Sequence, residues 1–221
     1  MVGPKIGPEM SEASGTGKML RFDPAEHLPQ NIYKLMVGCV VPRPIAFVSS
    51  VDEQGIYNLA PFSYFSAVCS KPPTVLFCPA VRLTTGKPKD TLRNVLATKE
   101  FVINIVSEEI AAEMNQTAAE VGPEVDEFEL AGLTPLPSET VRVPRVAESP
   151  VQMECRLREV VTISAAPGGG SIVIGEVLRF HVKEDLFDNY RIDPEKLNAV
   201  GRMGGPTYCR TQDRFDLERP K

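Results

Sequence analysis

Three cations and several hydroxyl groups gather in the segment 82–91. Arg82, Lys87 and Lys89 carry the positive charges, and Asp90 is placed to cap the helix that we expect to follow. The free amides and the dipole of a helix N-terminus attract anions, and a nearby Lys or Arg completes a phosphate site. The segment therefore predicts phosphate binding. The alternative is a solvated basic loop in which Asp90 only caps the helix.

A second cluster, residues 58–66, sets small, hydroxyl and amide side chains among aromatic ones. Pro61 interrupts strand pairing, because proline has no backbone N–H to donate. Such a surface can lie along a flat heteroaromatic ring and offer apolar contact with a few hydrogen bonds. The alternative is an ordinary bend between strands whose aromatic side chains fill the core, and the cluster taken alone favours this alternative.

Single residues outside these clusters carry less information. His181 lies in a strand-like run beside Arg179, and a lone histidine there is more often structural or solvated than catalytic. Its alternative role is to contact a substrate or to donate a hydrogen bond to a reduced cofactor. Arg43, between two prolines, is expected to hold a loop, and Cys69 and Cys78 are expected to be structural thiols.

Composition excludes several classes of function. The chain has 221 residues, of which 43% are hydrophobic, so it can bury a sizeable core. Its net charge of −5, without a basic run, argues against nucleic acid and an anionic membrane surface, and no apolar run is long enough for a membrane span. Two histidines make a His-based metal site unexpected. Five cysteines without a Cys-x-x-Cys pair, and an N-terminus that does not resemble a signal peptide, indicate a reducing, cytoplasmic setting.

Common catalytic motifs do not occur. The sequence has no Gly-x-Ser-x-Gly elbow, no His-Glu-x-x-His and no Walker loop. The glycine-rich run 201–205 follows an expected short helix rather than a strand, so it does not match a dinucleotide fingerprint. We therefore expect any chemistry to belong to a bound cofactor.

Short strands with helices between them must position the two clusters. Alternating and β-branched patterns predict strands at 45–51, 56–60, 63–69, 74–78, 101–106, 151–157 and 171–182. Short helices are expected at 90–98, after Ser107 and from Asp193. This spacing favours a mainly β barrel or sandwich over a parallel α/β sheet.

The chain is expected to form one domain after a disordered tail. Residues 1–18 hold almost nothing to bury and predict the tail, and residues 19–221 predict a single folded domain. Within it, the acid- and proline-rich stretch 120–148 is expected to be a surface excursion. In 151–157, apolar residues alternate with polar ones, which is typical of a half-buried strand with its polar side chains in solvent.

Several runs match a known family in their order and spacing. They are residues 33–35, 42–50, 58–65, 89–94, 101–104, 125–128, 148–150, 175–177 with His181, and 201–205. Together they resemble the flavin reductase-like, FMN-binding split-barrel proteins, and they span nearly all of the chain after the tail. The resemblance implies a Greek-key split β-barrel of six strands, a homodimer, and FMN held near the subunit interface.

The resemblance also implies how the clusters divide the cofactor. The isoalloxazine ring and ribityl chain would be held by Ser49, Ser50, Asn58, Leu59, Ala60, Pro61, Ser63, Tyr64 and Ser66. The phosphate would be held by Arg82, Lys87, Lys89 and Thr91, with Asp90 also among the cofactor-binding residues. His181 would border the nicotinamide and is the predicted catalytic residue.

The function implied is that of an FMN-binding oxidoreductase, an NAD(P)H:flavin reductase that passes a hydride from the nicotinamide to flavin N5. NAD(P)H would be a transient substrate, and a partner monooxygenase could receive the reduced flavin. An alternative is an FMN-binding electron-transfer protein without direct NAD(P)H reactivity. A third hypothesis is a non-enzymatic β-barrel that binds a partner through its acidic excursion.

Overall fold

The structure is a computed structural model that describes residues 9–11 and 19–220. Its strands are β1 (Glu9–Ser11), β2 (Met19–Arg21), β3 (Ala46–Val51), β4 (Tyr57–Phe62), β5 (Phe65–Ser70), β6 (Pro73–Phe77), β7 (Glu100–Ile105), β8 (Pro135–Leu136), β9 (Arg145–Val146), β10 (Val151–Ser164), β11 (Gly170–Val182), β12 (Phe187–Asp188), β13 (Arg191–Ile192), β14 (Val200–Arg202) and β15 (Tyr208–Arg210). The α-helices are α1 (Pro29–Cys39), α2 (Asp90–Thr98), α3 (Ala111–Gln116), α4 (Glu127–Ala131) and α5 (Pro194–Leu197). Short 3-10 helices occur at Pro24–Glu26, Glu108–Ile110 and Glu184–Leu186.

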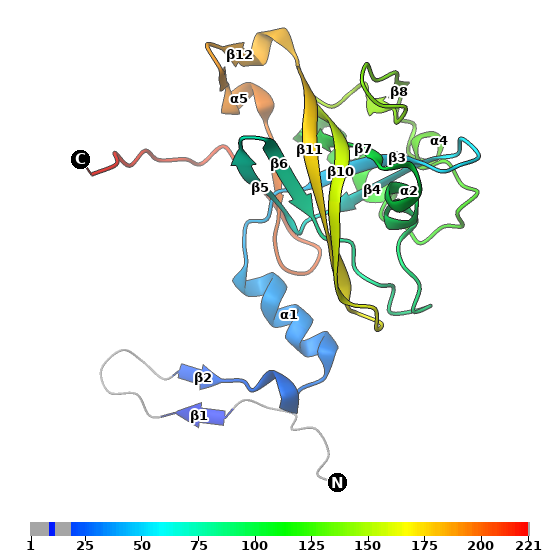
Figure 1. Cartoon of the computed structure of the whole chain (residues 1–221). Helices are drawn as coiled ribbons and strands as arrows, with labels where there is room; N and C mark the ends of the chain where they lie inside the picture. Colours follow the sequence, from blue (N-terminus) through cyan, green and yellow to red (C-terminus); the bar gives the residue numbers. More distant parts are fainter. Residues whose placement is uncertain (1–8, 12–18, 221) are drawn as a thin grey trace.

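One antiparallel sheet of seven strands forms the body, in the order β4-β3-β7-β10-β11-β6-β5 (Figure 1). Its two edge strands, β4 and β5, are joined by only Ser63 and Tyr64. Three peptide links span at most about 10 Å, so the sheet must curl until its edges approach each other. The rings of Phe62 in β4 and Phe77 in β6 are 5.1 Å apart, which shows the approach. The prediction of a mainly β split barrel is confirmed.

The curled sheet encloses an apolar core, and α2 closes one end of it. Ala46 and Val48 of β3 point inward beside Phe77 and Phe101, and Val95 of α2 joins the same cluster. Phe47, between those two β3 residues, lies on the opposite face because successive side chains of a strand alternate. Both faces of β3 are therefore buried.

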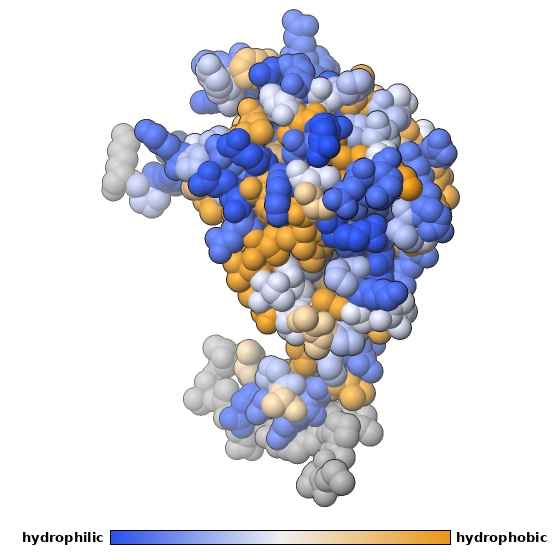
Figure 2. All heavy atoms as spheres, turned by 45° about the vertical axis from the view of Figure 1, so that its right-hand side comes forward, coloured by the Kyte–Doolittle hydropathy of each residue, from blue (hydrophilic) through white to orange (hydrophobic). Residues whose placement is uncertain are grey.

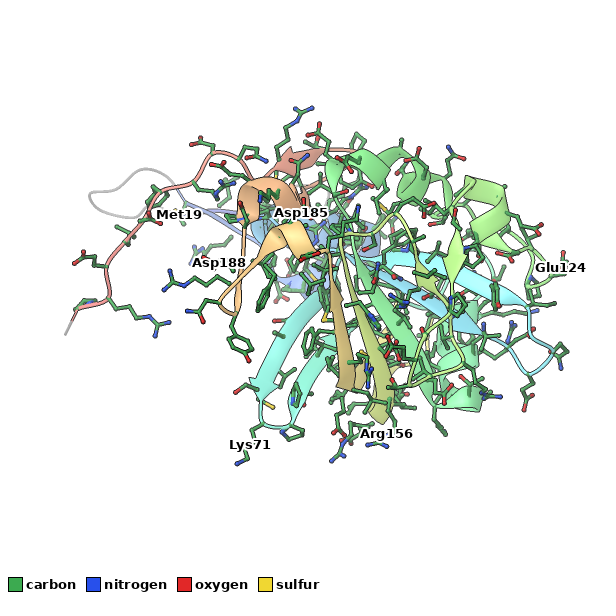
Figure 3. All side chains as sticks on the ribbon, turned by 90° about the horizontal axis from the view of Figure 1, so that it is seen from above. Met19, Lys71, Glu124, Arg156, Asp185 and Asp188 are labelled. Atoms are coloured by element: carbon green, nitrogen blue, oxygen red, sulfur yellow. The ribbon has the colours of Figure 1, made fainter. Side chains whose placement is uncertain are left out.

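The stretch 120–148 is not the surface excursion that the sequence predicts. Phe128, Val143 and Val146 are fully buried there, and they cover the outer face of β3 and β7. The many acids and prolines of this stretch predict solvent exposure. Its few apolar residues are irregularly spaced, and they are buried by contacts with strands distant in sequence. Lys71 lies in the turn between β5 and β6, and Glu124 lies on the far side of the molecule from it (Figure 3).

An arm made of the β1–β2 pair and α1 projects from the body (Figure 1). Helix α1 is not among the elements predicted from sequence, and Leu28 at its start makes no side-chain cap hydrogen bond. Tyr33 and Met36 on α1, and Val40 just after it, are more than half exposed. Figure 2 shows a continuous apolar patch on the body toward this arm. Within the predicted tail, Glu9–Ser11 pairs with Met19–Arg21, while 1–8 and 12–18 lie outside the described residues, so the disordered tail stays a prediction.

Burial in β10 also differs from the predicted pattern. Gln152 and Glu154 are buried like their neighbours Met153 and Cys155, although alternation places Gln152 and Glu154 on the other face of the strand. That face is covered because Gln152 donates to the carbonyls of residues 146 and 149 and the 138–143 loop lies over Glu154. Polar residues can occupy the positions because each finds hydrogen-bond partners.

Gly175 in β11 offers a sharp test of the packing. A Cβ atom there would lie 2.3 Å from Cζ of Phe101, a fully buried ring. Gly175→Ala is therefore expected to lower the free energy of unfolding by about 1–3 kcal/mol, the usual cost of overpacking. Gly38→Ala in α1 is the control, because its Cβ would meet no atom within 4 Å. The control should be neutral or stabilising by up to about 1 kcal/mol. Equal urea midpoints for wild type and Gly175→Ala would contradict the packing.

Candidate functional site

The predicted phosphate segment lines a hollow at the N-terminus of α2. The hollow measures about 590 Å³ and is bordered on its other side by residues 120–123. Arg82, Lys87 and Arg93 bring three positive charges to it, and Asp90 and Glu120 bring two negative ones. A positive excess at a helix N-terminus is the arrangement that binds phosphate or carboxylate groups.

The sequence predicts that Asp90 caps α2, but in the structure it does not. Lys89 occupies the cap position, and neither residue makes a side-chain cap bond. The carboxylate of Asp90 instead binds Arg82 Nη2 at 2.5 Å and Arg93 Nη1 at 2.8 Å. Arg82 also donates from Nη1 to the carbonyl oxygen of Pro88 at 2.7 Å, so it holds the loop in shape. No side chain caps the first turn, and although the Leu92 N–H donates to the Lys89 carbonyl oxygen at 3.1 Å, the N–H groups of Asp90 and Thr91 are left for an anion.

The two lysines of this segment are not equivalent. Lys87 lines the hollow, whereas Lys89 is not among its lining residues. Within residues 9–11 and 19–220, the Lys87 ammonium group makes no hydrogen bond or ion pair with another side chain. Lys87 is therefore the cation most available to an incoming phosphate.

A buried polar network ties β4 to α2. Asn58 donates from Nδ2 to Glu127 Oε1 at 2.8 Å and accepts at Oδ1 from the hydroxyls of Thr91 (2.7 Å) and Ser50 (3.2 Å). The backbone N–H of Leu59 donates to Glu127 Oε2 at 3.0 Å. Because these side chains are buried and bonded to one another, they position the strand and the helix rather than face outward.

Glu127 is the member of this network that sequence reasoning missed. Burial raises the pKa of its carboxyl group and outweighs the hydrogen bonds from Leu59 and Asn58, which lower it. It lies in the stretch predicted to be a surface excursion. The one available signal was its place in the 125–128 run, where Asp126 caps α4 by accepting from the Phe128 N–H at 2.8 Å.

The connection between β4 and β5 lies at a largely apolar hollow of about 370 Å³. Ser63, Tyr64 and Ser66 line it, together with Met36 of α1 and Val40 just after that helix. Three residues of the predicted ring-binding cluster are thus brought together at the opening of the split barrel, where a planar apolar group can enter.

Arg43 holds this corner, as the sequence predicts. Its side chain donates to the carbonyl oxygens of Val37 (2.7 Å), Val40 (2.7 Å) and Met203 (3.0 Å), and to the Ser63 hydroxyl at 3.2 Å. Arg43 is 4% exposed. It therefore joins α1, the chain after β14 and the end of β4 from a buried position.

Of the other predicted ring-binding residues, Ser49, Leu59 and Ala60 line none of these hollows and make structural contacts instead. Ser49 donates its hydroxyl to the carbonyl oxygen of Pro144 at 2.6 Å, and Leu59 lies in the core under α4. Ala60 packs against the barrel interior. Pro61 lines a third hollow, of about 200 Å³, together with Ser63.

His181 lies apart from all three hollows. Its Nε2 is 2.6 Å from Oε1 of Glu154, which is fully buried. Glu154 also accepts from the N–H groups of Glu139 (2.9 Å) and Thr140 (2.6 Å) and from the Thr140 hydroxyl. The Glu154 carboxylate on β10 therefore holds the 138–143 loop, and His181 on β11 bonds the same carboxylate. The catalytic role of His181 stays a prediction.

Other site classes find no support in the described part of the chain. No group of three or more His, Cys, Asp or Glu side chains is arranged to hold a metal ion there. Likewise, none of the helices in residues 19–220 is both long and apolar enough to cross a membrane.

The fold and the hollows define a split β-barrel with a cation-bearing hollow at one helix end and an apolar hollow at its open edge. This chain belongs to the family described as the flavin reductase like domain, whose model matches residues 37–200.

Solved structures agree with this membership. The chain is similar to nitrilotriacetate monooxygenase component B from Bacillus cereus, with 38% identity, coverage of 91% of this chain and 100% of that one, and a TM-score of 0.87. It is also similar to a 2-nitrobenzoate 2-nitroreductase from Pseudomonas fluorescens, with 33% identity, coverage of 90% and 96%, and a TM-score of 0.82. A proposed flavin reductase with a split barrel domain from Shewanella frigidimarina, 22% identical over 90% of this chain and 99% of that one, shares the fold with a TM-score of 0.78.

Proposed function

We propose that this chain binds FMN and acts as an NAD(P)H-dependent flavin reductase. The observation that carries the proposal is the placement of β4. Its Asn58 end is bonded to the N-terminus of α2, where the cationic hollow lies, and its other end leads to the apolar hollow at Ser63. Five residues of strand span about 17 Å, so an elongated molecule with a phosphate at one end and a flat ring at the other fits along the strand.

The residues present fit the phosphate of FMN. Lys87 has no competing partner among the described residues, and Arg82 is oriented by Asp90 with donors still unused. Thr85 offers a hydroxyl in the same hollow, and the first-turn amides of α2 are uncapped by any side chain. Together they would hold a dianionic group by charge-assisted hydrogen bonds.

The chain's part in catalysis would be to bind FMN, to orient it and to shield it from solvent. When bound, FMN supplies the two-electron chemistry that no side chain here provides. Ser63, Tyr64 and Ser66 would contact the ring, and Arg43 keeps that corner fixed from its buried position. The network of Glu127, Asn58 and the residues bonded to them would keep β4 in register with the phosphate hollow.

A homodimer and a cytoplasmic setting belong to the same proposal. The exposed apolar side chains of α1, and Val68 on β5, which is 52% exposed, form the kind of surface that a second copy covers. All five cysteines are free, which suits a reducing compartment. The similarity to a monooxygenase component B supports a partner monooxygenase as one destination of reduced flavin.

Anaerobic reduction of the FMN-loaded protein tests the function. Adding NADH or NADPH without oxygen should bleach the flavin absorbance near-stoichiometrically and faster than it bleaches free FMN, because binding orients the reactants. Readmitting oxygen should restore the colour.

The alternatives give different results. An electron-transfer protein without direct NAD(P)H reactivity would bind FMN but bleach only with a chemical reductant such as dithionite. A protein that binds no FMN in a titration would refute both flavin hypotheses and leave the non-enzymatic barrel.

A further inference from the structure

The glycine-rich hairpin after α5 builds a pocket next to the strand proposed to hold FMN, and the proposed function gives no role to the Arg202 and Tyr208 side chains that line it. Strands β14 and β15 bring Arg202 and Tyr208 opposite each other in register. Gly201 allows the close packing, since a Cβ there would lie 2.9 Å from Cys209 Sγ and 3.0 Å from Pro42 Cβ. The resulting pocket measures about 200 Å³.

The guanidinium group of Arg202 is presented in a fixed orientation. It stacks on the Tyr208 ring, with Cζ 4.4 Å from the ring centroid, and donates from Nη2 to the carbonyl oxygen of Gly205 at 2.7 Å. Arg202 makes no ion pair and no other side-chain hydrogen bond with the described residues. A guanidinium group has five N–H donors, so most of them remain available to a ligand.

The rest of the lining suits a small organic anion. The Tyr208 hydroxyl donates to Asn115 Oδ1 at 3.1 Å, which leaves the Asn115 amide donors free for the pocket. None of the lining residues is acidic. The remaining walls are mostly apolar and comprise Tyr33, Ile45, Pro61, Met114 and Ala118, with the Ser63 hydroxyl at one side.

We propose that this pocket binds the carboxylate of a small planar acid, with Arg202 as the anchor. One rigid, unpaired guanidinium group matches a monoanion, since its fork can hold both carboxylate oxygens. Apolar walls on the other sides match a flat hydrocarbon body. The pocket would be the subsite of an anionic electron acceptor, because it shares Pro61 and Ser63 with the strand proposed to hold FMN. That location rests on the proposed function, whereas the anion binding does not.

Calorimetric titration with benzoate tests the anchor. Wild type should bind benzoate at least tenfold more tightly than benzamide, which has the same shape without the charge. Arg202→Gln should weaken benzoate binding about tenfold or more, as expected for loss of a charge-assisted pair, and should leave benzamide unchanged. The benzoate affinity of Arg202→Lys should lie between those of wild type and Arg202→Gln, because lysine keeps the positive charge but cannot hold both carboxylate oxygens as a guanidinium group does.

Arg210→Gln is the matched control, since Arg210 lies on the same hairpin but binds Glu108 at 2.5 Å. It should leave benzoate binding unchanged. The proposal is overturned if benzoate does not bind, if Arg202→Gln binds it as tightly as wild type, or if inorganic phosphate displaces it at equal concentration. Circular dichroism must show both variants folded, and Arg202→Lys tests the anchor should Arg202→Gln fail to fold.

Adding FMN to the same samples separates this inference from the proposed function. Bound benzoate should shift the visible absorbance of FMN, which would support the acceptor subsite, and benzoate binding without any shift would overturn that location. If FMN fails to bind while benzoate binds through Arg202, the proposed function fails and the anion pocket stands. FMN binding without benzoate binding overturns the pocket alone.

Discussion

FMN binding is expected to weaken roughly 100-fold when Arg82 and Lys87 are both replaced by alanine. Each charge-assisted hydrogen bond contributes about 1.5–3 kcal/mol, and 1.4 kcal/mol is a factor of ten in affinity. Both residues line the hollow at α2, and Lys87 has no other partner among the described side chains. Fluorescence titration of FMN against wild type and the double variant measures the effect.

Riboflavin provides the sharpest control for this experiment, because it lacks the phosphate. The double variant should bind riboflavin as wild type does, and an equal loss for both ligands would point to misfolding of the loop instead. Lys71→Ala, in the distant β5–β6 turn, should change neither affinity. Lys89→Ala should have a smaller effect than Lys87→Ala, since only Lys87 lines the hollow. Unchanged FMN affinity in the double variant would refute the phosphate site.

The second large effect concerns stability. Glu154→Ala should lower the free energy of unfolding by about 3–5 kcal/mol, the range seen when one partner of a buried pair is removed. The change leaves two N–H groups, the Thr140 hydroxyl and the His181 ring without their acceptor. Glu176→Gln is the control, because Glu176 pairs with Arg156 and Arg158, which are more than half exposed. Such pairs contribute about 0–1 kcal/mol. Denaturant unfolding at pH 7 distinguishes the two variants.

The same carboxylate predicts acid sensitivity. Burial opposes ionisation of Glu154, but the hydrogen bonds from Thr140, Glu139 and His181 outweigh it and lower the pKa to about 2. The unfolded value is about 4.3, so the stabilisation is complete above about pH 5 and is lost as the pH falls toward 2. Its size is roughly 2–3 kcal/mol by linkage.

Glu154→Gln should therefore flatten the stability profile between pH 5 and 2, when urea midpoints are measured across that range. His181 bonds this carboxylate, and Glu139 and Arg179 lie beside His181 and pair with each other, so His181→Ala serves as the companion variant. An unaltered acid limb in Glu154→Gln would contradict the assignment. His181→Ala also tests the predicted catalytic role, which requires slower nicotinamide turnover at unchanged FMN affinity.

Local sequence patterns were sufficient to predict the elements whose formation depends on adjacent residues. The β3–β4 hairpin follows from a β-branched run, a turn and its return, and α5 begins at Asp193 and Pro194 as predicted. The cationic loop could also be found, since Arg82, Lys87 and Asp90 lie within nine positions of one another. The resemblance of the nine runs, rather than any pattern within them, selected the split barrel from among the β folds.

Long-range contacts decided the rest. Pro29 at the first position of α1 is a weak start signal without a side-chain cap, and only packing against Arg43 and the hairpin after α5 reveals the role of this helix. The polar residues Glu127 and Glu154 look solvated in sequence, yet distant backbone amides and side chains make their burial possible. Short-range patterns encode strands, turns and helix ends because those depend on adjacent residues. Which buried charge finds which partner depends on segments that only the folded chain brings together.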